Sequence, residues 1–470
     1  MPSFALPSFG TPSRTPPGPA RRRATALLRT LAVLAAALVL TAAAGAAAHP
    51  GRTSGGTPPL APDVVHTGTG PTGYRVTFRY KDPDATRVQI KGEWYFADPY
   101  ELAALSTDDG TALETPGTPP TRWRPGDIPL AYPNSPAANW PVTDMKRGPG
   151  GVWTYTTPLP SGVFTYSFYV DCADDTQATC TAASDPANPP WNEHDGKVLG
   201  TVERTSQVYV PADTRFGTVD AAWQGPSPTG RRGTLRHLTY PAPTSVTPPG
   251  ENHLSVYTPA GYDPRRAKPY PTLYLFSGDA TEMDWSTQGD AGHILDHLIA
   301  TGQIPPMVVV MPNTAGFPAS TGYASFDRNL TDTLIPYLES HYHVSTTAGD
   351  RAAAGLGYGA SLTNSLLFDH TSAFGSYGVF SPGRRGNYTL PAASALTDAQ
   401  VTALSAARVY VGGGWQDPSH DYHADEVSLL SGLGVAVTPG FVNGGHSWSA
   451  WRVNLKDFLT HTAFFPPVAG

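Results

Sequence analysis

The second half of the chain alternates short apolar runs with segments of helical period. Continuous apolar runs at residues 272–276 and 307–311 are typical of strands buried on both faces of a parallel sheet. Residues 293–300 and 327–342 repeat their apolar positions with the period of a helix. This alternation predicts an α/β domain with a mostly parallel sheet and helices on both faces. Further strands are expected at 234–240, 253–259, 351–355, 408–411 and 435–438, and further helices at 362–368, 424–433 and 449–461.

The first half carries a different pattern, in which apolar and polar residues alternate over short stretches. Residues 74–80 and 87–94 alternate as the strands of a half-buried sheet do. Residues 151–156 and 163–171 do so again, and the turn signal at 159–162 predicts that they form a β-hairpin. Short alternating strands separated by turn signals predict a β-sandwich.

One stretch of this half resembles a known domain. The run GVWTYTTPLPSGVFTYSFYVD at 151–171, followed by DPANP at 185–189, resembles the immunoglobulin-like early-set domain that precedes many esterases. The resemblance implies a β-sandwich over residues 71–215. Such domains are similar to carbohydrate-binding modules, but we expect a spacer, because burial of Trp94 and Trp191 cannot be read from the sequence.

The N-terminal segment has the features of an export signal. Three arginines at 21–23 precede an apolar run at 31–40, and the small residues at 45–48 offer a cleavage site. We expect residues 1–48 to be a signal peptide and residues 49–70 to be a disordered linker. An uncleaved anchor is the alternative, which the short apolar run disfavours. These features predict a secreted or cell-surface protein with no stable membrane span after cleavage.

The amino-acid composition argues against nucleic acid as a binding partner. Charged residues make up only 15% of the 470 residues and the formal net charge is −7, so the chain has no basic footprint for nucleic acid. The chain has two cysteines, Cys172 and Cys180, and their proximity in an exported protein predicts a disulfide.

Two groups of residues invite a metal ion, and we predict that neither binds one. His420 and His423 have helical spacing but lack a clear third ligand, so a solvent-exposed first helical turn is the better interpretation. Asp171, Asp174 and Asp175 lack the loop pattern of a dedicated calcium site. We therefore expect no metal and no cofactor.

The sharpest local signal is a glycine frame between a strand and a helix. Gly355, Gly357 and Gly359 follow a strand of small residues and precede the helix expected at 362–368. This outline resembles the nucleophile elbow of α/β-hydrolases, Gly-x-Ser-x-Gly. The central position is Gly357, so the hydroxyl oxygen that the chemistry requires is missing.

Candidates for the other catalytic groups follow in the order that this fold uses, which is nucleophile, acid, histidine. Asp417 comes shortly after the strand at 408–411, where a carboxylate can orient an imidazole. His446 lies in a glycine-rich loop before the last helix, where a general base belongs.

Three further runs make the chain resemble the esterase D family over about residues 230–466. They are LYLFSGDATEMDW at 273–285, IPPMVVVMPN at 304–313 and GGHSWSAWR at 444–452. This family includes enterochelin esterases, feruloyl esterases and the mycolyltransferases of actinobacteria. The resemblance implies an α/β-hydrolase domain, to which we assign residues 216–470.

Carried over to this chain, the resemblance implies that His446 is the base, Asp417 the acid and Gly357 the nucleophile position. The oxyanion donors would be the Tyr358 N–H and an N–H near Ser277 and Gly278. The chain departs from the family pattern at Gly357. It departs again in the oxyanion loop, where the usual His-Gly is Ser277-Gly278, followed by Asp279.

Other serines are weaker candidates for the nucleophile. Ser361 would lie about one helical turn beyond the elbow tip, where a serine that packs the helix is the simpler interpretation. Ser277 lies in the oxyanion loop, and Ser381 and Ser447 have no motif around them.

The sequence thus predicts an exported esterase-family hydrolase that has lost its nucleophile and is weakly active or inactive. Its ligand would be a small-molecule or polysaccharide-linked ester. The alternatives are a ligand- or glycan-binding pseudoenzyme of the cell envelope, hydrolysis by a water that His446 activates, and an intact esterase that uses another serine.

Overall fold

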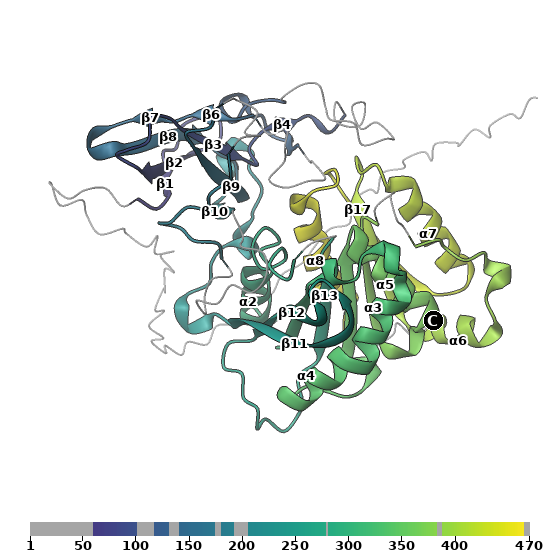
Figure 1. The fold of residues 1–470 in the computed structure, drawn as a ribbon. Helices are drawn as coiled ribbons and strands as arrows, with labels where there is room; N and C mark the ends of the chain where they lie inside the picture. The colour runs from purple at the N-terminus through teal and green to yellow at the C-terminus, as the bar shows by residue number, and fades with distance from the viewer. Residues whose placement is uncertain are drawn as a thin grey trace, which may run out of the picture. The chain divides into compact units, whose positions relative to one another are not determined.

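The computed structural model describes residues 60–100, 117–130, 141–173, 180–191, 205–278, 281–382 and 388–464 (Figure 1). The expected signal peptide and the linker up to residue 59 lie outside the described residues. Residues 58–470 form one compact unit. Among the described residues, no helix has the length and apolar character needed to cross a membrane.

Two four-stranded sheets make up the first β-rich region, which is a β-sandwich. The strand β1 lies inside the segment that we expected to be a linker, so that expectation was wrong for the residues of β1. The first sheet has the order β1 (Asp63–His66), β2 (Tyr74–Lys81), β8 (Val152–Pro158), β7 (Lys146–Arg147). The second has the order β10 (Ser206–Val210), β9 (Gly162–Val170), β3 (Val88–Gly92), β6 (Thr143–Asp144), and β4 (Phe96–Ala97) pairs separately with β5 (Ile128–Pro129).

The aromatic residues of the two sheets meet in one core. Phe78 of β2 packs against Tyr166 of β9 with ring centroids 4.7 Å apart, and Trp94 is buried beside them. The expected hairpin between β8 and β9 is wrong, because β8 pairs with β2 whereas β9 pairs with β3 and β10. Leu159, in the connection, is fully buried, so the chain crosses through the core between the sheets and does not make an exposed turn. The narrower kinship with early-set domains stays a prediction.

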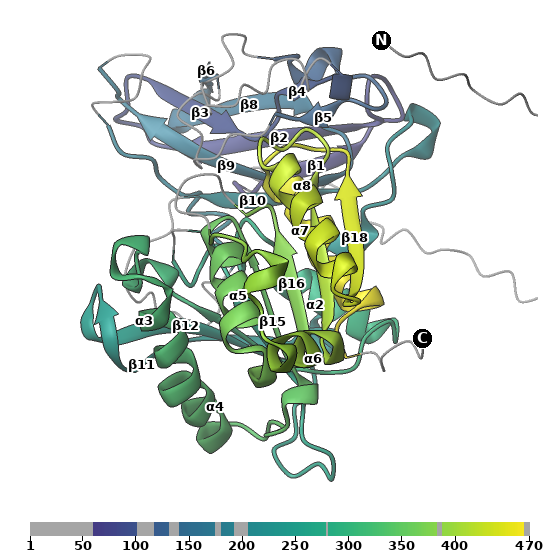
Figure 2. The ribbon, with the colours of Figure 1, turned by 90° about the vertical axis from the view of Figure 1, so that its right-hand side faces the viewer.

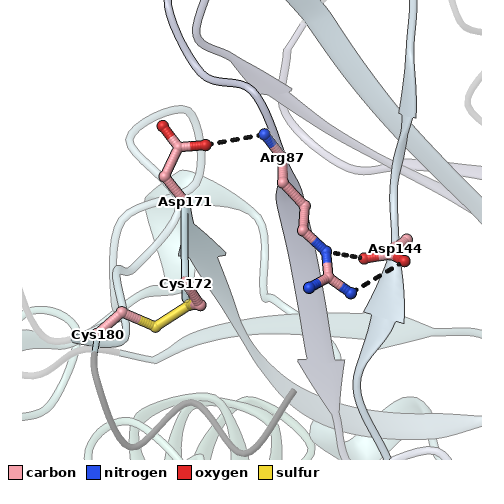
Figure 3. Close-up of a disulfide and its surroundings, with 5 residues drawn as sticks. All are labelled: Arg87, Asp144, Asp171, Cys172 and Cys180. Atoms are coloured by element: carbon pink, nitrogen blue, oxygen red, sulfur yellow. Dashed lines mark hydrogen bonds and ion pairs between the residues drawn. A yellow bond between two sulfur atoms is a disulfide. The ribbon is translucent and has the colours of Figure 1, made fainter. Parts of the chain in front are cut away.

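A disulfide closes the loop after β9. Cys172 is bonded to Cys180, and the neighbouring Asp171 accepts a hydrogen bond of 2.8 Å from the backbone N–H of Arg87 (Figure 3). The Arg87 side chain in turn pairs with Asp144 of β6 at 2.7 Å. These contacts join the end of β9 to the start of β3, and the start of β3 to β6.

The second region is an α/β-hydrolase fold built on an eight-stranded mixed sheet. The first two strands form a long antiparallel hairpin at one edge, and β12 also runs antiparallel to β14. The remaining neighbours are parallel. The order is β11 (Thr234–Val246), β12 (Pro249–Thr258), β14 (Val308–Pro312), β13 (Thr272–Phe276), β15 (Arg351–Leu356), β16 (Ser376–Phe380), β17 (Arg408–Gly414), β18 (Ala436–Val442).

Helices cover both faces of this sheet, as the alternating sequence pattern predicts (Figures 1 and 2). One apolar cluster lies under α2 (Ala291–Ala300) and α8 (Trp448–His461). The other lies under α3 (Tyr323–Asn329), α4 (Ile335–His341), α5 (Tyr358–Asp369), α6 (Asp398–Ala406) and α7 (His420–Gly432). The helix expected over 327–342 is divided, because the segment Leu330–Leu334 between α3 and α4 is wound as a π-helix.

A buried arginine on α8 connects the sandwich to the hydrolase region. The Arg452 side chain donates hydrogen bonds to the carbonyl oxygens of Gln288 and of Val163 in β9, at 2.9 and 3.1 Å. It also donates to Gln224 Oε1 at 3.2 Å and lies 3.5 Å from the Glu93 carboxylate. A buried guanidinium needs partners for its charge and donors, and this one uses Nε and Nη1 in hydrogen bonds while Nη2 lies near the Glu93 carboxylate.

Candidate active site

The glycine frame forms a sharp turn from β15 into α5 (Figure 2). A Cβ on Gly355 would lie 2.3 Å from the Gly359 carbonyl oxygen, and one on Gly359 would lie 2.3 Å from the Ser277 carbonyl oxygen. The outer glycines are therefore required for the strand, the helix and the loop after β13 to approach this closely. Gly357 lies at the tip with φ 54° and ψ −118°, which a residue with a side chain rarely adopts.

The tip of the turn faces the candidate base. A Cβ built on Gly357 would lie 3.9 Å from His446 Nε2 and 3.9 Å from the Gly278 Cα, which are ordinary van der Waals distances. The space that a serine side chain would need is therefore open, although the backbone conformation would strain it. Gly357 therefore leaves an open position that faces the candidate base and carries no hydroxyl.

The candidate acid and base lie beside each other at the carboxyl ends of β17 and β18. Asp417 Oδ2 is 3.1 Å from His446 Nδ1, and Asp417 Oδ1 also accepts a hydrogen bond of 2.8 Å from the Ser419 N–H. The Trp451 ring packs edge-on against the imidazole at 4.9 Å. With Nδ1 bonded to the carboxylate, Nε2 is the nitrogen that faces Gly357 and can accept a proton there.

Electrostatics favour the charged form of this pair. Burial works to raise the pKa of Asp417, but the His446 imidazole outweighs it, so that this pKa lies well below its ordinary value. Burial alone would lower the pKa of His446, yet the charge and the hydrogen bond of Asp417 raise it above the ordinary value. His446 is therefore a stronger base than a free histidine, as general-base chemistry requires.

The candidate oxyanion donors flank the same tip. Tyr358 is the first residue of α5, where a backbone N–H has no partner within the helix, and its hydroxyl donates to the Phe317 carbonyl at 2.7 Å. Gly278 lies next to Gly357, since its Cα would be 3.9 Å from a Cβ on Gly357. Ser277 is buried and donates to the Thr281 carbonyl at 3.2 Å, so its hydroxyl serves the loop. Asp279 lies outside the described residues.

The other serines have structural surroundings. Ser361 is buried within α5, and Ser447 Oγ lies 2.9 Å from Ser449 Oγ. Ser381 is more unusual, because it is fully buried, has a positive φ of 50°, and carries a hydroxyl without a hydrogen-bond partner among the described residues. Its carbonyl oxygen accepts the Gly357 N–H at 3.1 Å, so this residue supports the elbow. The sequence analysis named Ser381 only as a weak nucleophile candidate and gave it no supporting role, because β16, the strand before it, was not predicted.

A second histidine lies behind the acid, which corrects one expectation. We expected His420 and His423 in a solvent-exposed turn, but His423 is fully buried against β17. A Cβ on Gly413 would lie 2.6 Å from the His423 ring, so only glycine in the strand leaves room for it. Burial lowers the pKa of His423 to about 4, and the Asp417 charge opposes this only in part. Within the described ranges, no three metal-binding side chains gather at one point.

One family model and several known proteins are similar to this chain. Residues 245–462 match the family model described as "Putative esterase". The chain is 27% identical over 253 residues to an endo-1,4-beta-xylanase/feruloyl esterase of Xylanibacter ruminicola, covering 51% of this chain and 32% of that protein. It is 36% identical over 112 residues to endo-1,4-beta-xylanase Y of Acetivibrio thermocellus, covering 22% of this chain and 10% of that protein. The chain thus spans a third or less of the length of these two relatives.

Two of the solved structures that are similar to this chain are esterases by name. The enterobactin esterase of Shigella flexneri shares 18% of its sequence with this chain, with a TM-score of 0.49 over 85% of this chain and 95% of that one. A ferulic acid esterase shares 22%, with a TM-score of 0.45 over 51% of this chain and all of that one.

Proposed function

Because these comparisons support the esterase family, with a match over residues 245–462, we propose that the chain binds carboxylic esters at the Gly357 elbow without forming an acyl-enzyme. The observation that carries this proposal is that Gly357 has no side chain. A Cβ at this position would lie 3.9 Å from His446 Nε2. The ligand class we propose is an aromatic acyl ester of a small molecule or polysaccharide, since one relative is named a feruloyl esterase.

Without a serine, the remaining groups support only a slow reaction with water. A water molecule at the Gly357 tip would attack the acyl carbon while His446 Nε2 takes its proton and Asp417 stabilises the imidazolium. The N–H groups near Tyr358 and Gly278 would bind the oxyanion. Collapse of the tetrahedral intermediate then breaks the ester C–O bond, and His446 returns the proton to the leaving oxygen. In subtilisin, loss of the nucleophile lowers kcat by about 10⁶.

The test compares the natural chain with Gly357→Ser, His446→Ala and the double variant. We expect very low hydrolysis of p-nitrophenyl acetate and methyl ferulate by the natural chain and no labelling by a fluorophosphonate probe. Gly357→Ser should gain both labelling and activity, and the double variant should lose that gain. Activity of the natural chain that His446→Ala abolishes would support hydrolysis by activated water.

One result would overturn the proposal in favour of an intact esterase. If the natural chain turns over esters rapidly and the fluorophosphonate labels it, another serine acts as nucleophile. Peptide mapping of the labelled residue would then identify it, and Ser381 and Ser277 are the residues to inspect first.

We further propose that the chain acts outside the cell. The basic and apolar pattern of residues 1–48 and the disulfide between Cys172 and Cys180 support this, because disulfides persist in oxidising compartments. N-terminal sequencing of the protein from culture medium should find a chain that begins near residue 49.

A further inference from the structure

The loop that carries the candidate base contains two consecutive glycines. Gly444 and Gly445 directly precede His446, and both are buried. Glycine gives a backbone more conformational freedom than any other residue, so this loop has little rigidity of its own. On its C-terminal side the loop is held by α8, which begins at Trp448. On its N-terminal side it needs contacts from another segment to keep one conformation.

Gln416 supplies two such contacts. Its backbone N–H donates to the Gly444 carbonyl oxygen at 3.0 Å, and its side-chain Oε1 accepts the Gly444 N–H at 2.9 Å. The preceding Trp415 N–H donates to the Val442 carbonyl oxygen at 2.8 Å, which continues the pairing of β17 with β18. Gln416 therefore binds both polar groups of the Gly444 backbone.

The side-chain bond of Gln416 is difficult to replace. A Cβ on Gly414 would overlap the Gly444 carbonyl oxygen, so the two loops touch at this point. Because Gly444 is buried, water cannot readily take the place of the glutamine oxygen. A buried N–H without an acceptor is strongly unfavourable, so the loop would have to move if Oε1 were removed.

The contacts of Gln416 bear on the distance between acid and base. Gln416 directly precedes Asp417, and Gly444 lies two residues before His446. Asp417 Oδ2 is 3.1 Å from His446 Nδ1, and a loop shift of about 1 Å would take the two atoms beyond hydrogen-bonding distance. One short segment thus carries the acid and holds the loop of the base.

We propose that Gln416 is a positioning residue, which holds the Gly444 backbone so that the His446 imidazole stays paired with Asp417. Gln416 supplies no reacting group and acts only through His446. This role rests on the proposed function only in the assignment of His446 as base and Asp417 as acid, and it does not depend on which ester binds at Gly357.

The pKa of His446 reports whether the pair is intact. Burial works to lower this pKa, but the charge and the hydrogen bond of Asp417 outweigh burial and raise it above the ordinary value of 6.5. His423 of α7 also lies near Asp417, but burial lowers its pKa to about 4, so it is neutral in the range where His446 titrates. A loop that moves away from Asp417 should therefore bring the pKa of His446 back toward 6.5.

The test follows the titration of His446 by NMR in the purified full chain, where the resonance missing from His446→Ala identifies it. Gln416→Met removes the acceptor at a similar side-chain length and should lower the pKa of His446. Gln416→Glu keeps an acceptor oxygen and should hold this pKa at or above its value in the natural chain. Gln400→Met is the matched control, because Gln400 accepts the Thr397 N–H at 3.0 Å beside α6 and its loss should leave His446 unchanged.

Three results would overturn the inference. The first is the same pKa of His446 in Gln416→Met as in the natural chain. The second is an equal fall in Gln416→Glu, because an acceptor would then be present without effect. The third is a natural chain in which His446 titrates at or below 6.5, since Gln416 would then have no pairing to maintain.

A second variant covers a failure to fold. If Gln416→Met does not fold, Gln416→Asn takes its place with the same expected fall in the pKa of His446, because its amide is one methylene shorter and does not reach the Gly444 N–H. No ester is present in these titrations. Failure of this inference is therefore distinct from failure of the proposed ester binding, which the Gly357 variants test.

Discussion

At the scale of single residues, Gly357 combines an open side-chain position with a backbone conformation that suits glycine. Its φ of 54° and ψ of −118° strain any residue with a Cβ, although the Cβ itself would meet no atom closer than 3.9 Å. Strain of this kind is about 1–3 kcal/mol. Glycine at this position therefore avoids backbone strain and places no hydroxyl beside His446.

Gly357→Ser should accordingly lower the free energy of unfolding by about 1–3 kcal/mol. Gly357→Ala is the matched control, because it adds the same Cβ strain without a hydroxyl and should melt close to the serine variant. Thermal unfolding followed by circular dichroism measures both. A serine variant that melts above the natural chain would show that the conformation is not strained.

His423 should make the fold sensitive to acid. Its pKa in the folded state is about 4, below the ordinary value of 6.5, so the unfolded chain binds its proton more readily. Stability from this group is therefore complete above pH 6.5 and is lost as the pH falls toward 4, by up to about 3 kcal/mol. Denaturant unfolding between pH 7 and pH 4 should show a smaller loss for His423→Leu than for the natural chain. Equal losses in the two proteins would contradict the assignment.

At the scale of secondary-structure elements, the sequence predicted those strands and helices that have a clear local hydrophobic pattern. The continuous apolar runs predicted β13 and β14, and the sequence pattern also predicted the positions of α2, α7 and α8. The strand β16 was not predicted because a central glycine interrupts the apolar run of Ser376–Phe380. The pairing partners of β8 and β9 also could not be predicted from the sequence. Two consecutive strands have the same local pattern whether they pair as a hairpin or lie in different sheets.

The same limit applies to the candidate site. Chain order and glycine-rich loops were enough to single out Asp417 and His446, which the fold brings to 3.1 Å. Ser381 and His423 lie near this site only through the packing of β16, β17 and α7, and no spacing in the sequence reports such contacts.

The connection between β8 and β9 offers a test at this scale. Because Leu159 is fully buried, Leu159→Ala should lower the free energy of unfolding by about 2–5 kcal/mol. A leucine in an exposed hairpin turn would give almost no change. Val219→Ala is the control, since Val219 is 76% exposed. Chemical denaturation of the three proteins compares them directly, and a small effect of Leu159→Ala would restore the hairpin interpretation.

At the scale of the whole molecule, Arg452 joins the helix that follows His446 to the sandwich. Its guanidinium is buried between the Val163 carbonyl and the Glu93 carboxylate, and burial raises the pKa of Glu93 despite the nearby positive charge. Removing one partner of a buried pair leaves the other without compensation.

Arg452→Leu should therefore destabilise the chain by about 3–5 kcal/mol. Lys456→Leu, on the same helix, removes a partly exposed contact with Asp457 at 3.4 Å and should change stability by less than about 1 kcal/mol. The double variant Glu93→Leu with Arg452→Leu should recover part of the loss, because the Glu93 carboxylate is no longer left without its partner. Urea unfolding compares the three. A loss for Arg452→Leu no larger than that for Lys456→Leu would show that the link carries little energy.

The open tip at Gly357 also bears on how long a bound ester would stabilise the protein. An active esterase consumes its ligand, so any protection that the ligand gives against heat fades as product accumulates. A chain that holds an ester without cleaving it reaches a steady occupancy set only by concentration and Kd, and its rise in melting temperature persists. Such a protein would act as a reservoir for its ester, releasing it intact when the surrounding concentration falls.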